Sequence, residues 1–231
     1  MRLVAAVLLL SLVPTPVHAE SAEVIGTSVQ GRPIKAYRIG DPDARVKAVV
    51  LGAIHGDERA GVVLAQALLK QQHIEGVDLW VVPTINPDGL AHDDRRNAHG
   101  VDLNRNWGKN WAPLTGKYYA GPKPWSEPET RAFRDFIHRV KPRFIVSFHQ
   151  PLYGVGRSGE RPAFLKRLAT GLRLPRKSFN CSGMCHGTMT QWYNAHHAGT
   201  AVTVEFGHRP SRYYLTHRGV RGTVRAVLGH W

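Results

Sequence analysis

Three apolar runs, each followed by a side chain that can bind a metal or carry a proton, limit the fold of this sequence more than any other feature. The runs and the residues after them are 48–54 with His55, 143–148 with His149, and 201–204 with Glu205. Short apolar runs bounded by turn signals are typical of buried strands. Because ligands of α/β sheets gather outside the carboxyl ends of the strands, we expect the three side chains to share one site.

A metal centre is the first chemical expectation. Glu58 follows His55 in His-Gly-Asp-Glu, and two imidazoles with one carboxylate form an open zinc set that leaves a position for water. We predict that His55, Glu58 and His149 hold one Zn²⁺ and that Glu205 is the base. Taken singly, His55 suits a surface turn, His149 a buried core position and Glu205 a structural ion pair; their joint placement favours the site.

The segment from Arg95 to Trp107 is rich in arginine and asparagine. An arginine fork binds a carboxylate through two hydrogen bonds, so Asn104 and Arg105 suit the terminal carboxylate of a peptide. Arg95 can face the oxyanion that develops at the attacked carbonyl. Without a zinc set nearby, the same segment would read only as a basic loop.

Strand and helix patterns alternate along the chain. The expected strands are a hairpin over 24–39 and the segments 47–54, 78–82, 143–148 and 201–206. The expected helices are 58–70, a segment that starts at a Ser126–Glu129 capping box and runs to Val140, 162–172 and 219–229. A turn is expected at 86–89 and a long functional loop at 90–124. The order predicts one α/β domain, a mixed twisted β-sheet with helices on both faces.

The amino terminus has the pattern of an export signal. Arg2 is followed by an apolar stretch and by small residues at 17–19, and the apolar stretch is too short to span a bilayer. We therefore expect residues 1–19 to be a signal peptide and 20–231 to be the catalytic domain. The expected location is periplasmic or extracellular in a bacterium, without stable membrane insertion.

The formal net charge of +14 suits an anionic partner. No nucleic-acid-binding signature is present, so we expect no nucleic acid and favour an anionic cell-wall polymer. General solubility explains the charge equally well. The two cysteines, Cys181 and Cys185, are expected to form a disulfide in an exported chain, and the bond would stiffen one loop.

Several motifs resemble the zinc carboxypeptidase family of the carboxypeptidase A type. They are His55-Gly-Asp-Glu58, Asn86-Pro-Asp-Gly89, Gly100-Val-Asp-Leu-Asn-Arg-Asn106, His149 and Glu205. The segments 121–130, 137–140 and 146–152 are similar to the members that cleave murein peptides. The resemblance implies zinc on the three ligands, Glu205 as proton shuttle and hydrolysis of the γ-D-glutamyl-meso-diaminopimelate bond in a wall peptide.

The resemblance also implies a specificity pocket, which Met189 and Thr190 would line. Digestive members carry a mobile tyrosine shortly before the specificity residue, but the matching position here is Ser182. Tyr193, Tyr153 and His186 remain as substitutes. Two other functions stay open: a small-molecule deacylase of the aspartoacylase or succinylglutamate desuccinylase type, and a catalytically inactive wall-binding module.

Overall fold

The computed structural model describes residues 21–71, 74–157, 159, 161–179, 181 and 183–230. The expected signal segment, residues 1–19, lies outside the described residues. Within them no helix has both the length and the apolar character needed to cross a membrane.

A mixed, eight-stranded sheet runs through the described part of the chain, in the order β1-β2-β4-β3-β5-β8-β6-β7. The strands are β1 Ser21–Thr27, β2 Pro33–Arg38, β3 Lys47–Leu51, β4 Asp78–Val82, β5 Phe144–His149, β6 Gly154–Gly156, β7 Arg176–Lys177 and β8 Thr200–Glu205. The central strands β4, β3, β5 and β8 are parallel to one another. On one side β2 pairs antiparallel with β4 and β1 with β2; on the other side β6 pairs antiparallel with β8, and the edge strand β7 is parallel to β6.

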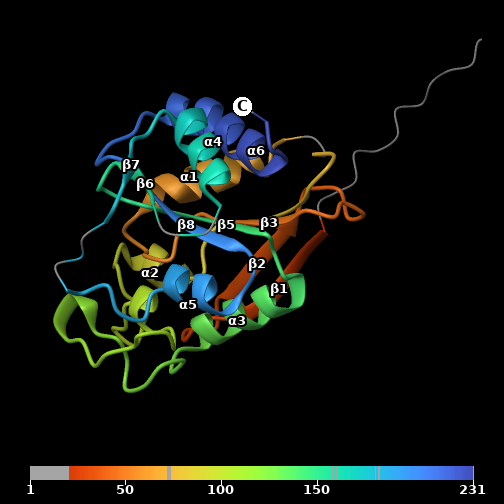
Figure 1. Ribbon diagram of the computed structural model, residues 1–231. Coiled ribbons are helices and arrows are strands. Elements are labelled where there is room, and N and C mark those ends of the chain that lie inside the picture. Colours follow the sequence, from red (N-terminus) through yellow and green to blue (C-terminus); the bar gives the residue numbers. More distant parts are fainter. Residues whose placement is uncertain are drawn as a thin grey trace, which may run out of the picture.

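Helices cover both faces of this sheet, as predicted (Figure 1). They are α1 Arg59–Leu68, α2 Pro87–His92, α3 Pro128–Val140, α4 Pro162–Leu172, α5 Met189–His196 and α6 Val220–Leu228. Two 3₁₀ turns, η1 Leu103–Arg105 and η2 Gly116–Tyr118, and a π-helical segment, η3 Tyr214–Gly219, complete the set. Helices α1, α4 and α6 lie on one face, and α3 and α5 lie on the other (Figure 1).

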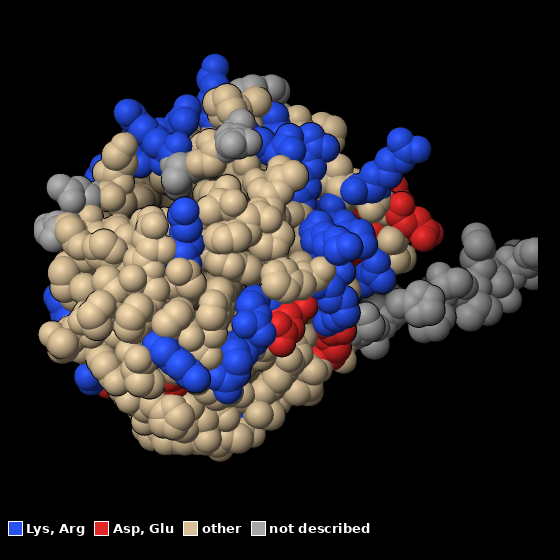
Figure 2. All heavy atoms as spheres, turned by 60° about the horizontal axis from the view of Figure 1, so that its bottom comes forward, with Lys and Arg blue, Asp and Glu red and all other residues tan. Residues whose placement is uncertain are grey.

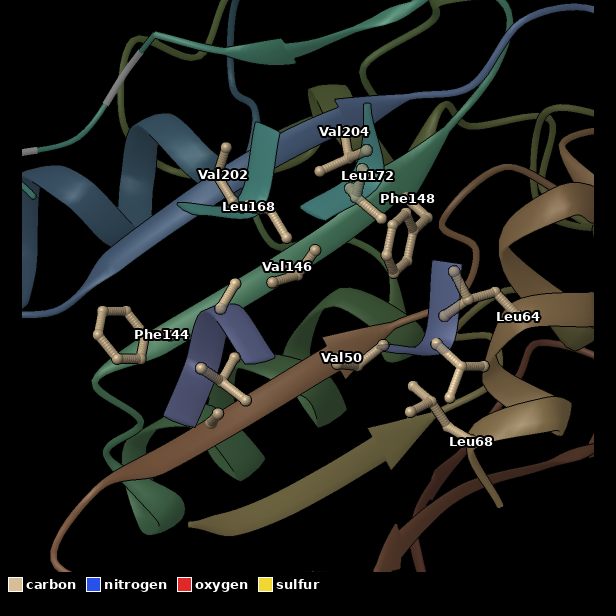
Figure 3. Packing of buried hydrophobic residues seen from close by; sticks show 14 of the residues in the cluster. Val50, Leu64, Leu68, Phe144, Val146, Phe148, Leu168, Leu172, Val202 and Val204 are labelled. Atoms are coloured by element: carbon tan, nitrogen blue, oxygen red, sulfur yellow. The ribbon is translucent and has the colours of Figure 1, made fainter. Parts of the chain in front are cut away.

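Each face has its own hydrophobic core. Val50, Val146 and Val202 point toward the α1, α4 and α6 side, where they pack with leucines and phenylalanines (Figure 3). The alternate residues Val49 and Ile145 face the α3 and α5 side. Strands buried on both faces need apolar residues at every position, which explains why they read as continuous apolar runs.

Three local expectations change in the structure. The expected turn at 86–89 is the beginning of α2, because the Asn86 side chain accepts a hydrogen bond from the Gly89 N–H and Pro87 suits the first turn. Helix α5 was not anticipated. Its Thr188 caps the Gln191 N–H, and its buried residues Met189, Trp192 and Tyr193 have helical spacing.

The expected capping box at Ser126 is wrong. Helix α3 begins at Pro128, its N-cap is Glu127, and no side chain caps it. The Ser126 hydroxyl instead donates to the Glu127 carboxylate. Glu129 turns away from the helix end and accepts hydrogen bonds from the Val29 N–H and the Asn97 amide. The Ser126 hydroxyl also accepts a hydrogen bond from the Asn106 amide, so both side chains are engaged outside the local motif.

Candidate metal centre and substrate-binding loop

The parallel strands bring the predicted metal ligands to one edge of the sheet. Glu58 is the N-cap of α1, which follows β3, and His149 ends β5. Glu205 ends β8 and pairs in register with His149. Strand order alone therefore gathers residues that are far apart in the sequence.

His55, Glu58 and His149 form a compact, buried cluster. One potential ligand atom from each lies within 4.8 Å of the other two. The Glu58 carboxylate lies 2.9 Å from Nδ1 of His55 and 2.9 Å from Nδ1 of His149, and the two Nδ1 atoms are 3.3 Å apart. Although burial opposes ionisation, the two imidazoles hold the pKa of Glu58 well below its usual range.

Two further residues fix the orientation of the imidazoles. Nε2 of His55 lies 3.1 Å from the Asp102 carboxylate, and Nε2 of His149 lies 3.0 Å from the Ser147 hydroxyl. Each ring thus uses Nε2 for an outer hydrogen bond and presents Nδ1 to Glu58, the arrangement found around metal-bound histidines. The donor set and its support fit one Zn²⁺.

Sequence reasoning did not assign roles to Asp102 and Ser147. Asp102 is fully buried, and its pKa is held below the usual range, because His55 and Arg95 outweigh the effect of burial. Ser147 precedes His149 by two residues on the same strand and so shares its face. The sequence signals that could have identified them were the carboxylate of Asp102, two residues before Asn104, and the hydroxyl of Ser147, two residues before His149.

Glu205 lies beside the cluster and is largely buried, with 8% of its surface exposed. Burial raises its pKa, and the negative charge of Glu58 adds to this rise while His149 opposes it. Oε2 accepts a hydrogen bond from the Leu152 N–H at 3.2 Å. A carboxylate with a raised pKa close to a metal site suits the uptake and return of a proton.

Arg95 reaches the same site from the long loop. Its guanidinium donates to the Asp102 carboxylate at 3.0 Å and to Glu58 at 3.2 Å, and Nη1 lies 3.2 Å from Nδ1 of His55. The Asp102 contact anchors the side chain, while Nη1 points into the ligand cluster.

Asn104 is oriented by α5. The Met189 N–H donates to Oδ1 of Asn104 at 3.0 Å, which leaves the amide NH₂ group to donate elsewhere. The Met189 side chain is 1% exposed within the core cluster, so Met189 reaches this site through its backbone. Thr190 is half-buried, with its hydroxyl 3.5 Å from that of Thr188.

Arg105 is a buried cation without a carboxylate partner. Its exposed fraction is 5%, and Nε is buried with no hydrogen-bond partner. Nη1 donates to the Asn104 carbonyl, and the guanidinium lies 5.1 Å from the centre of the Tyr118 ring. Among the described residues no carboxylate lies within ion-pair distance of it. Burying such a charge is costly unless an anion completes the pairing.

The three candidates to replace the mobile tyrosine lie at different distances from the site. Tyr193 is buried and its hydroxyl donates to the Pro142 carbonyl, which removes it from the site. Tyr153 is 50% exposed and directly follows Leu152, the partner of Glu205. His186 lies beside the Asn110 carbonyl, and Ser182 is outside the described residues. Tyr153 is therefore the best placed of the three.

The disulfide between Cys181 and Cys185 is present. It lies in the loop before α5, and the Cys185 carbonyl accepts a hydrogen bond from the Gln191 side chain at 2.8 Å. The hydrogen bond from Gln191 thus holds the disulfide-bonded loop against α5, the helix that orients Asn104.

The His-Gly-Asp-Glu and Asn-Pro-Asp-Gly motifs meet through their glycines. A Cβ atom on Gly56 would lie 2.0 Å from the carbonyl carbon of Gly89, so only glycine allows this backbone approach.

Gln150 joins another pair of segments. Its side chain accepts a hydrogen bond from the Ala60 N–H and donates to the carbonyls of Gly207 and His208.

Comparison with known proteins agrees with this geometry. A family model described as zinc carboxypeptidase matches residues 18–152, more than half of the chain. Murein peptide amidase A of Escherichia coli strain K12 is 36% identical over 144 residues, which are 56% of this chain and 59% of that protein. In that alignment the chain spans less than two thirds of its relative.

Solved structures share the fold. The murein-tripeptide amidase of Escherichia coli O157 matches with a TM-score of 0.70 and 27% identity, over 91% of this chain and 92% of that one. Carboxypeptidase A from Helicoverpa armigera matches with a TM-score of 0.76 and 19% identity, over 91% of this chain and 69% of that one, a likeness of fold. The chain belongs to the zinc carboxypeptidase family.

Proposed function

We propose that the protein is a zinc-dependent metallocarboxypeptidase or amidase that hydrolyses an amide bond next to a free carboxylate. The observation that carries this proposal is the cluster of His55, Glu58 and His149, with both Nδ1 atoms presented to one carboxylate. A Zn²⁺ ion held there would lower the pKa of a water and polarise a carbonyl group.

Asn104 and Arg105 would position the substrate. Among the described residues neither the NH₂ group of Asn104 nor Nε of Arg105 has an acceptor, and a terminal carboxylate would supply acceptors for both. Pairing with Arg105 would also offset the cost of burying its charge. This requirement for an anion favours an exopeptidase over an endopeptidase.

The proton transfers fall to Glu205. Its carboxylate takes a proton from the attacking water, whose oxygen adds to the carbonyl carbon. When the C–N bond breaks, Glu205 returns that proton to the leaving amine. Nη1 of Arg95 would donate to the oxyanion, since zinc would neutralise Glu58 and release this group from its present contact.

The substrate we propose is a murein peptide, cleaved at the γ-D-glutamyl-meso-diaminopimelate bond. The similarity to murein peptide amidase A supports this choice. We propose further that residues 1–19 direct export, so that the domain 20–231 meets the wall or its fragments outside the cytoplasm. Lys and Arg outnumber Asp and Glu on the face seen in Figure 2, which supports contact with an anionic wall polymer.

The test is mass spectrometry of defined muropeptides incubated with the protein. We expect zinc-dependent release of diaminopimelate from the tripeptide, loss of this activity with a chelator, and no cleavage of N-acetyl-aspartate. Glu205→Gln should retain zinc by elemental analysis but lose activity by about two to four orders of magnitude. Near-normal turnover in that variant would remove Glu205 from the mechanism, and cleavage of N-acetyl-aspartate alone would favour a deacylase.

A further inference from the structure

A hollow with a volume of about 590 Å³ lies at the opposite end of the sheet from the candidate metal centre. Arg143, which precedes β5, and Gly199, which precedes β8, both line it. The metal ligand His149 is at the other end of β5, six residues from Arg143, which corresponds to roughly 20 Å of strand. The hollow is therefore separate from the proposed catalytic site.

The lining of this hollow is basic. Six of its side chains are cationic or can become so: His138, Lys141, Arg143, Arg161, His196 and His197. No described carboxylate lines it. Among the described residues Lys141, Arg143 and Arg161 have no carboxylate within ion-pair distance. Three permanent cations held together without neutralising acids repel one another and attract an anion.

Arg161 supplies an independent indication of a ligand. Its Nε atom is buried and has no hydrogen-bond partner among the residues that the structure describes. One terminal nitrogen, Nη2, donates to the carbonyl of Ala198, another residue of the lining, so the guanidinium is fixed at the hollow. A buried N–H without an acceptor is uncommon in folded proteins and points to a group that binds there.

The imidazoles around this hollow do not form a metal-binding cluster among the described residues. His138 and His197 have ring centres 5.5 Å apart, and Nδ1 of His196 and of His197 lie by the carbonyls of Trp192 and Tyr193. Among the described residues, the only cluster spaced to hold a metal is His55, Glu58 and His149. Pro142 and Ala198 add an apolar wall, which suits an organic carrier.

We propose that this hollow, the basic pocket, binds the phosphate group of an organic phosphate. The fork of Arg161 and the charges of Lys141 and Arg143 would bind the phosphate oxygens, and the apolar wall would contact the carrier. The phosphate can come from a small ester or from the end of a phosphate-bearing polymer.

Isothermal titration calorimetry on the full protein tests the proposal with phenyl phosphate as the probe and phenol as the uncharged control. We expect saturable binding of phenyl phosphate at one site and none of phenol. Arg161→Gln should weaken binding about tenfold or more. Lys141 and Arg143 are exposed, so Arg143→Gln is a second variant that leaves the fold intact and should also weaken binding. Arg221→Gln, an exposed arginine outside the pocket, is the matched control.

Two results would overturn the proposal. One is the absence of saturable binding by the wild-type protein. The other is binding that survives in Arg161→Gln and Arg143→Gln but disappears in Arg105→Gln, because the phosphate would then occupy the substrate-binding loop. Muropeptide hydrolysis should be unchanged in Arg161→Gln. A short glycerol phosphate oligomer distinguishes the sources: displacement of phenyl phosphate by the oligomer identifies a polymer end, and binding of phenyl phosphate alone identifies a small ester.

Discussion

Arg105 shows how much of this site depends on one side chain. It is buried, it has no described acidic partner, and its Nε lacks an acceptor. An arginine in that condition destabilises the free protein and is stabilised when a carboxylate arrives. We therefore propose that the substrate carboxylate supplies the negative charge and the hydrogen-bond acceptor that Arg105 does not find among the described residues.

Arg105→Lys is therefore expected to raise KM for the muropeptide about tenfold or more with a smaller change in kcat, because lysine keeps the charge but loses the two-donor fork. Steady-state kinetics on the free acid and on its C-terminal amide check this. The amide should bind the wild-type protein weakly, and Arg105→Lys should add little further loss. An equal loss on both substrates would show that Arg105 does not read the carboxylate. Arg221→Lys serves as the control.

At the level of elements, the strand-end loops depend on side chains that bridge them. Gln150 joins the amino end of α1 to the segment after β8 through three backbone groups. Asn106 has a similar role in the long loop: its amide contacts Ala120, Lys123, Ser126, Glu127 and Thr130. A loop of this length keeps its shape because such residues replace regular backbone pairing.

Gln150→Leu should lower the free energy of unfolding by about 1–3 kcal/mol, because the Ala60 N–H loses its acceptor. It should also lower kcat while zinc content stays normal, since the proposed ligand Glu58 lies two residues from Ala60. Denaturant titration and kinetics provide the two measurements. Gln71→Leu, just after the carboxyl end of α1, removes a glutamine whose side chain donates to the nearby Ala67 carbonyl and joins no distant segment among the described residues, and should have little effect. Equal effects of the two substitutions would contradict the bridging role.

Across the whole molecule, Asp88 links the first hairpin to α2. Its carboxylate accepts hydrogen bonds from the Ser28 hydroxyl, the Gln30 N–H and Arg32. Burial opposes ionisation, but these donors hold the pKa of Asp88 below its ordinary value. A lowered folded-state pKa contributes stability that is complete above the unfolded pKa of about 4 and is lost as the pH falls through the folded value.

Asp88→Asn should accordingly lower the melting temperature at pH 7, and the difference from the wild type should shrink as the pH falls below about 4. Thermal melts between neutral and acidic pH measure this difference. Asp135→Asn, which removes an exposed carboxylate, should show no comparable trend. A difference for Asp88→Asn that stays constant across the range would rule out its contribution to acid sensitivity.

The sequence alone determined the position of those strands and helices whose apolar residues recur with the period of the element itself. The central strands were predicted because both of their faces are apolar, and α4 was predicted with the bounds it has, Pro162–Leu172. That His55, Glu58 and His149 lie together was also within reach, because the segments that carry them follow parallel strands that end at one edge. The fold class and the family resemblance followed from the same residues.

Tertiary structure decided which polar groups pair across long distances. Ser126 and Glu129 match a local capping pattern, yet partners as far away as Val29 take up Glu129. The orienting contacts of Asp102 and Ser147, and the lack of an acceptor for Nε of Arg105 among the described residues, likewise depend on where whole segments lie. A hydrogen bond depends on angstrom-scale geometry that no periodicity encodes. Hydrophobic patterns specify the layers of this protein, whereas its chemistry depends on contacts that exist only once the layers have packed.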